Sequence, residues 1–183
     1  MNRGVARVLR HRDFRIFEIG HWISTIGFWN FRIALGWLTW QLTESGFWLS
    51  VMAFAEAFPG AVLLPFTGAI ADRVHRLNMF RTTQFVHFAL VSIVAALTLA
   101  GHINQYILAG LVFMIGINAA FGMPARMTLP PNLVPRDDIS PAVALNSMLF
   151  QVSMFLGPAL AMNAGRIRAD IGSAMTNALG DGP

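Results

Sequence analysis

Two ionisable side chains lie inside long apolar stretches of the sequence, where a charge needs a partner or water. Arg32 lies near the middle of one stretch, and Glu56 lies at a similar depth in the next. Both are equally distant from Glu44, so a simple helical hairpin would bring them level. A lone arginine at the centre of a membrane helix costs about 2.5–3.5 kcal/mol by insertion scales. We expect an ion pair that either only fixes helix packing or presents a cavity charge, which binds substrate or couples to protons.

Further polar residues share the stretch of Arg32. They recur at spacings of three, four or their sums, which places them on one helix face. Such a face cannot point at lipid, so we expect it to face the protein interior or an aqueous cavity. Glu18 and His21 lie near the start of the stretch, where both should reach water as a solvated pair. The face comprises Glu18, His21, Thr25, Arg32 and Thr39.

Composition places these residues in a membrane protein. Of 183 residues, 55% are hydrophobic and only 12% are charged, whereas soluble domains carry about 25% charged residues. With no cysteine and no motif for zinc, a nucleophile elbow, phosphate or a dinucleotide, we expect no enzyme, cofactor or metal site. The net charge of +4 comes from arginines at the ends of apolar runs, so nucleic acid is not expected as a partner.

Five stretches are long enough, or nearly so, to cross about 30 Å of hydrocarbon as helices. Backbone groups cannot stay unpaired in lipid, and these runs are too long and unbroken for barrel strands. The predicted fold class is therefore an all-α membrane protein with five transmembrane helices in contact with the lipid bilayer. The predicted spans, within a bundle over 19–161, are 19–40, 47–70, 80–100, 106–123 and 142–161.

Arginines predict the orientation of these spans. The arm 1–18 and the second and fourth connections are basic, whereas the first and third connections carry no basic residue. The positive-inside rule then puts the N-terminus in the cytoplasm of a multi-pass plasma membrane protein.

The tail, residues 162–183, breaks this alternation with Arg166 and Arg168. It has no sixth apolar run and is rich in small and polar residues, so we expect it to be disordered. A second interpretation is that the coding frame is lost near Met162.

Several motifs resemble the major facilitator superfamily, in the branch of effector and siderophore exporters. A Gly followed by an Asp-Arg pair and further basic residues is similar to that family's loop between helices two and three. The Gly157-Pro158 pair resembles the signature of its antiporter members. The match covers roughly 10–161 and rests on Gly68 to Arg76, Ala34 to Trp37, Leu42 to Ser45, Pro124 to Arg126, Leu133 to Asp138 and Ala144 to Ser147.

The resemblance implies the N-terminal half of a twelve-helix fold, or of a fourteen-helix variant, with alternating access between two halves. It implies a cytoplasmic gating loop of Gly68, Asp72, Arg73 and Arg76, which Arg126 could join. The alternative is that these arginines only set topology. The mid-membrane arginine of proton-coupled members is missing from the fourth stretch, where Asn118 is the only strong polar group.

The sequence thus predicts the N-terminal part of a secondary transporter in a bacterial inner membrane. It would export a small-molecule substrate in its full-length form by proton-coupled antiport, and would not transport alone. The rival hypothesis is a non-transport membrane protein that binds or scaffolds a partner.

Overall fold

Helices make up the fold. The computed structural model describes residues 7–71, 74–132 and 134–180, which contain no β-strand. This agrees with the all-α fold class expected from the sequence. The long helices are α2 (Arg12–Thr43), α3 (Gly46–Ala71), α4 (Arg76–Leu99), α5 (Gln105–Asn132) and α6 (Ile139–Gly180), with a 3-10 turn η1 (Arg136–Asp138) before α6.

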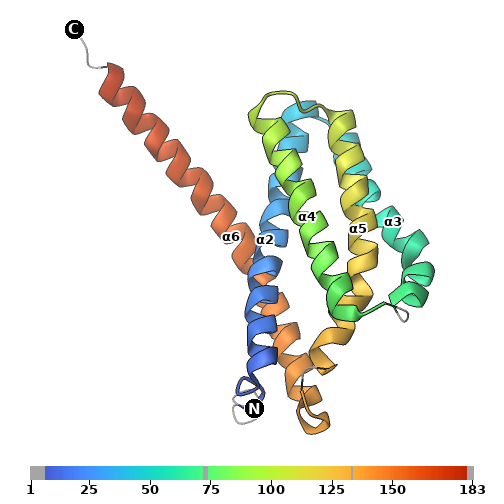
Figure 1. Ribbon diagram of the computed structural model, residues 1–183. Helices are drawn as coiled ribbons and strands as arrows, with labels where there is room; N and C mark the ends of the chain where they lie inside the picture. Colours follow the sequence, from blue (N-terminus) through green and yellow to red (C-terminus); the bar gives the residue numbers. More distant parts are fainter. Residues whose placement is uncertain (1–6, 72–73, 133, 181–183) are drawn as a thin grey trace.

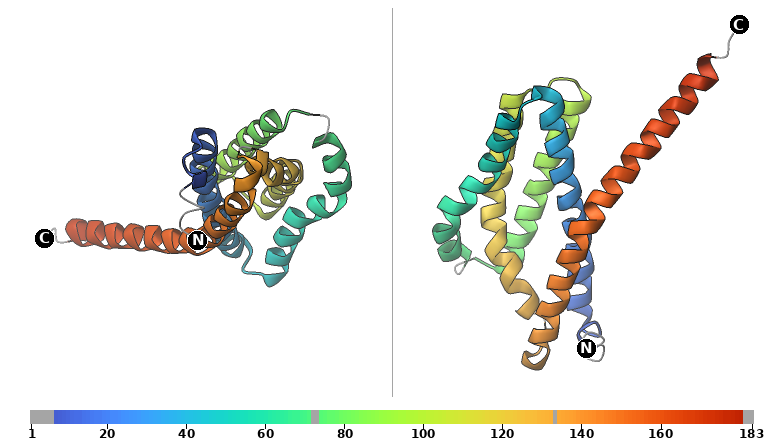
Figure 2. Two further views of the ribbon diagram at one scale, coloured as in Figure 1. Left: turned by 90° about the horizontal axis from the view of Figure 1, so that it is seen from below. Right: turned by 180° about the vertical axis from the view of Figure 1, so that it is seen from behind.

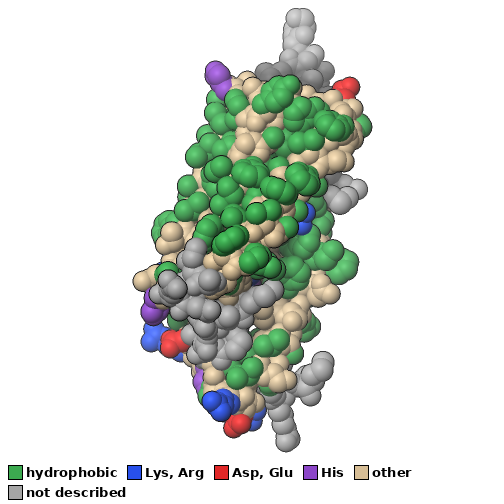
Figure 3. Space-filling view, turned by 90° about the vertical axis from the view of Figure 1, so that its right-hand side faces the viewer, with side chains coloured by type: hydrophobic (Ala, Val, Ile, Leu, Met, Phe, Trp, Pro, Cys, Tyr) green, Lys and Arg blue, Asp and Glu red, His purple; other side chains and the backbone are tan. Residues whose placement is uncertain are grey.

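Four helices in the described part of the chain are long and apolar enough to cross a membrane, and α2 is not among them. The polar face of α2 lowers its mean hydropathy, so the predicted span 19–40 stays a prediction. Hydrophobic side chains cover much of the face shown in Figure 3, and most of the charged side chains visible on it lie near one end. The four segments that are long and apolar enough to cross a membrane are Gly46–Gly68, Leu77–Leu99, Gln105–Pro124 and Arg136–Leu160.

Local signals in the sequence end the helices on the side away from the N-terminus. Glu44 takes a left-handed conformation (φ 46°), and its N–H donates to the Trp40 carbonyl at 2.8 Å, which closes the tight turn between α2 and α3. Gly101, with φ 69°, occupies the left-handed position after α4 that glycine adopts without strain. Asn104 then caps α5, since its side-chain oxygen accepts from the N–H groups of Tyr106 and Ile107.

Two packed groups of helices form the bundle. In one group α5 packs against both α3 and α4, and in the other α6 packs beside α2. Figures 1 and 2 show α6 beside α2 over the lower half of the molecule. Contacts of α2 with α3 and with α5 join the groups, and a core cluster of Leu35, Met52, Val94, Leu108 and Val112 fills the space between α2, α3, α4 and α5.

Several helices extend beyond the segments predicted to span. Helix α2 begins at Arg12, inside the predicted arm, and α5 continues through Pro124 to Asn132. Where a disordered tail was expected, the backbone of α6 continues as a helix to Gly180 and leans away from the bundle (Figure 1). Elongating an existing helix is easier than nucleating one, and alanine, methionine and arginine favour it, so a polar composition did not end α6.

Candidate functional site

The polar face of α2 is turned inward. Glu18, His21, Thr25 and Thr39 are buried, as the helical spacing predicted. The two threonine hydroxyls donate to carbonyls one turn earlier, at 2.8 Å each, so the backbone satisfies them. The charged members of the face therefore remain to be explained.

Arg32 and Glu56 are in contact. Arg32 Nη2 lies 3.4 Å from Glu56 Oε2, which joins α2 to α3 at the level that the hairpin geometry predicted. The guanidinium also lies over the rings of Phe28 and Trp29, 5.8 and 5.7 Å from their centroids. The side chain of Arg32 is 43% exposed and that of Glu56 is 18% exposed, so the pair is not sealed inside the core.

Glycines on α5 and α6 allow close backbone approach beside this pair. A Cβ added at Gly116 of α5 would lie 2.5 Å from the carbonyl oxygen of Glu56. A Cβ added at Gly157 of α6 would lie 2.6 Å from Trp29 Cβ and 3.1 Å from the backbone nitrogen of Asn30. Gly157, predicted from the antiporter-like motif, thus lies where α6 crosses α2, with Pro158 next to it inside α6.

Glu18 does not form the solvated pair that the sequence suggested. It is only 2% exposed, and both of its carboxylate oxygens are buried without a hydrogen-bond partner. His21 instead stacks on Phe17, with centroids 5.7 Å apart. Glu18 precedes the predicted span 19–40, and burial raises the pKa of its carboxyl to about 7 because desolvation disfavours the charged form. The helical spacing predicted that Glu18 faces inward, but its position near the end of the predicted span suggested contact with water, which the structure does not show.

The predicted gating loop is described only in part. Asp72 and Arg73 lie outside the described residues, as does the side chain of Arg76. Gly68 lies near the end of α3, and a Cβ added there meets no atom of the described residues within 4 Å outside its own helix backbone. Arg126 is half-buried and lines a cavity with residues of α2 and α4. The charge network of this loop stays a prediction.

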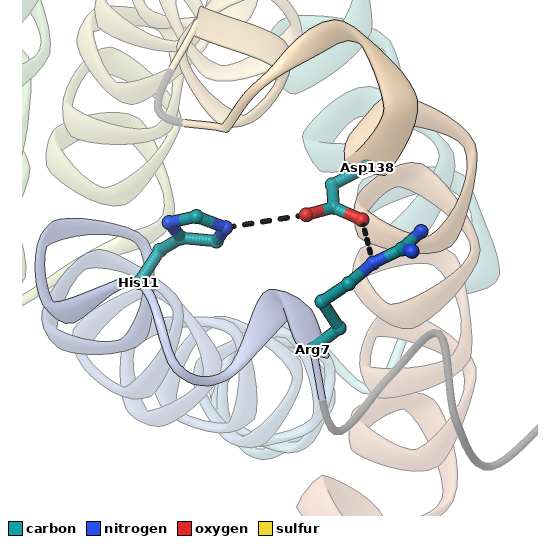
Figure 4. Close-up of polar contacts among 3 residues, drawn as sticks. All are labelled: Arg7, His11 and Asp138. Atoms are coloured by element: carbon teal, nitrogen blue, oxygen red, sulfur yellow. Dashed lines mark hydrogen bonds and ion pairs between the residues drawn. The ribbon is translucent and has the colours of Figure 1, made fainter.

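Sequence reasoning missed a polar cluster at the N-terminal end of the bundle (Figure 4). Asp138 of η1 is buried and accepts a hydrogen bond from Arg7 Nε at 2.5 Å. His11 Nε2 lies 3.2 Å from its other carboxylate oxygen. An apolar cluster that includes Val8 and Val134 packs around these groups. The available signal was the acidic pair Asp137 and Asp138 in an otherwise basic connection.

Comparison with known proteins identifies the family. Residues 5–181 match the family described as transmembrane secretion effector, so the match continues past Ala161, where the motif resemblance stopped. The staphyloferrin A transporter of Staphylococcus aureus is 26% identical over 150 residues, which cover 81% of this chain and 36% of that protein. The MdtD protein of Escherichia coli, provisionally named for multidrug resistance, is 30% identical over 146 residues, covering 76% and 30%.

The chain therefore spans about a third of the length of these curated relatives. No solved structure matches it significantly. Both relatives bear names of transporters or resistance proteins, and the apolar helices mark a multi-pass membrane protein. These findings agree with the family expected from the motifs and point to a transporter rather than an enzyme. Since the match covers nearly the whole chain, the chain belongs to the transmembrane secretion effector family of the major facilitator superfamily.

Proposed function

We propose that this chain acts as the N-terminal part of a secondary transporter that exports small molecules by proton-coupled antiport. Its N-terminus would lie in the cytoplasm and its helices in a bacterial inner membrane. The family match and the transport and resistance names of its relatives support the transporter assignment. The gating loop of Gly68, Asp72, Arg73, Arg76 and Arg126 belongs to the same proposal.

The exposure of the Arg32–Glu56 pair carries the proposal. Both residues fall within predicted spans, yet almost half of the Arg32 side chain is accessible. Lipid is a poor environment for a guanidinium, so intramembrane charges of this kind face the bundle interior or a water-filled cavity. A pair that only fixes packing needs no exposed surface. The observed exposure favours a charge that lines a cavity.

Glu18 supplies a group that can exchange protons. Its carboxyl is buried without a hydrogen-bond partner, so the protonated form is favoured there until a partner or water arrives. A carboxyl whose pKa is about 7 gains and loses a proton within the ordinary range of cytoplasmic pH. Antiport requires such a group, because inward proton movement must be coupled to outward substrate movement.

The proposal can be tested in the chromosomal gene of the native host, so that the protein has its natural length. We expect Glu56→Gln to abolish export, seen as lost accumulation of exported compounds in the medium and as retention of ethidium in the cells. Glu44→Gln, which changes an exposed glutamate in the turn between α2 and α3, should leave both readouts unchanged. Membrane levels of each variant would be compared by immunoblot.

A gene deletion that alters neither the medium nor dye retention would overturn the transport proposal. In that case a stable complex with a membrane partner, isolated in mild detergent, would favour the scaffold hypothesis. The five-helix chain reconstituted alone in proteoliposomes should show no counterflow above empty vesicles, because it cannot form the two-halved cavity of the family by itself.

A further inference from the structure

A cavity lies between α2, α4 and α5, and its lining includes neither Arg32 nor Glu56. Its volume is about 250 Å³. Helix α2 contributes Ser24 and Phe28, α4 contributes Gln84 and His87, and α5 contributes Arg126. The described lining contains no carboxylate.

Arg126 supplies the only full positive charge in this lining. Its Nε is buried and has no hydrogen-bond partner, and it takes part in none of the ion pairs among the described residues. Its charge is close enough to interact electrostatically with both His21 and His87. Arg32, by contrast, has a carboxylate and two aromatic rings as neighbours. A buried guanidinium nitrogen without an acceptor is unfavourable, so Arg126 Nε calls for an acceptor from outside the described residues.

The other walls fit the body of an organic anion. The centroid of the His87 ring lies 6.5 Å from that of Phe28 and 6.4 Å from that of Phe31. These rings form an aromatic surface in the same cavity as Arg126. Gln84 Nε2 donates to Ser24 Oγ at 3.1 Å, so neutral hydrogen-bonding groups line the same cavity. Ligand sites typically combine such apolar walls with a few convergent polar groups.

We infer that the cavity between α2, α4 and α5 binds a small organic oxyanion, a carboxylate or a phosphate, through Arg126, with the apolar part of the ligand against Phe28 and Phe31. The planar guanidinium fork of arginine matches the geometry of both oxyanions. The same chemistry is available from a free solute or from the headgroup of an anionic lipid. As a statement about the exported substrate this rests on the proposed function, but binding itself requires no transport.

Binding can be measured on the purified chain in a neutral detergent, with 4-fluorobenzoate as the probe and fluorine NMR as the readout. The uncharged 4-fluorobenzamide controls for apolar contacts alone. We expect saturable benzoate binding, little benzamide binding, and affinity roughly tenfold weaker in Arg126→Gln, since charge-assisted hydrogen bonds are about twice as strong as neutral ones. Arg81→Gln, which removes an exposed arginine of α4, should bind as the wild type does.

The source of the anion is tested in nanodiscs of phosphatidylcholine with or without phosphatidylglycerol. Competition of phosphatidylglycerol with the probe in the wild type would assign the site to a lipid headgroup, and lack of competition would assign it to a free solute. Both results support an oxyanion site. Equal binding of benzoate and benzamide to the wild type would overturn the inference, even if Arg126→Gln failed to fold, and so would absence of saturable benzoate binding. Neither result would affect the transport assay with Glu56→Gln.

Discussion

Replacing Glu56 by glutamine tests how strongly the ion pair between α2 and α3 stabilises the bundle. The substitution keeps the shape of the side chain and removes its charge, which leaves Arg32 without its carboxylate partner. Breaking a fully buried pair costs about 3–5 kcal/mol, whereas a fully exposed pair contributes about 0–1 kcal/mol. Glu56 is mostly buried, but Arg32 is nearly half exposed, so we expect the free energy of unfolding to fall by about 1–2 kcal/mol.

The opposite substitution, Arg32→Gln, should destabilise the bundle more. It leaves the less exposed partner, Glu56, without a counter-charge. It also removes the contacts of the guanidinium with Phe28 and Trp29, which contribute about 0.5–1 kcal/mol each at exposed sites. We therefore expect a loss of about 2–3 kcal/mol.

Both variants and the double variant can be unfolded with SDS in mixed micelles and followed by tryptophan fluorescence. The double-mutant cycle should give a coupling energy of about 1 kcal/mol, since residues in contact couple by about 0.5–3 kcal/mol. The control Glu44→Gln should change stability by no more than about 0.5 kcal/mol. A coupling energy below about 0.3 kcal/mol, or a larger loss for Glu56→Gln than for Arg32→Gln, would refute the reasoning.

Two further predictions follow from described contacts, and a third follows from the predicted orientation of the chain. Asp138→Asn should release the N-terminal segment, so that trypsin cleaves after its arginines roughly tenfold faster, the ratio that corresponds to about 1.4 kcal/mol. The control Asp137→Asn, at the exposed neighbouring residue, should leave the cleavage rate unchanged. Gly157→Ala should cost about 1–3 kcal/mol by overpacking the crossing of α6 with α2. Gly60→Ala should cost less, because its added methyl group meets no described atom outside its own helix within 4 Å. In this cysteine-free chain, His102→Cys should react with an impermeant maleimide in intact cells, because its connection is predicted to lie outside.

Each of these predictions has an opposite outcome that is easy to recognise. Equal trypsin rates for the two aspartate variants would mean that the cluster at η1 does not hold the N-terminal segment. Equal stabilities of the two alanine variants would mean that α6 does not approach α2 closely at Gly157. Labelling of position 102 only after the cells are broken open would reverse the predicted orientation.

Periodicity and hydropathy predicted the inward face of α2 and five spans, of which four coincide with helices apolar enough to cross a membrane. These properties depend on residues a few positions apart. They also brought Arg32 level with Glu56, since a short turn leaves a hairpin little choice of register. Helix ends were less predictable. Neither Pro124 nor the polar tail ended a helix, because a helix that already exists continues through residues that would not have started one.

Local sequence patterns could not predict contacts between segments that are distant in the sequence. The burial of Glu18 depends on the helices that pack on its face of α2, and the contacts of Asp138 come from residues more than a hundred positions away. Gly157 was recognised as part of a motif, but only its approach to the backbone of α2 gives a physical reason for a glycine there.

By itself, the sequence determined that this is a helical membrane protein with charges placed inside its apolar runs, because composition and spacing along one helix are local properties. The tertiary structure decided which of those charges have partners. Arg32 meets Glu56 because a tight turn pairs their helices. By contrast, Arg126 Nε and both carboxylate oxygens of Glu18 are buried without a hydrogen-bond partner. Whether a charged side chain finds a partner depends on how separate helices cross, and only the packing of the helices in three dimensions determines the crossing.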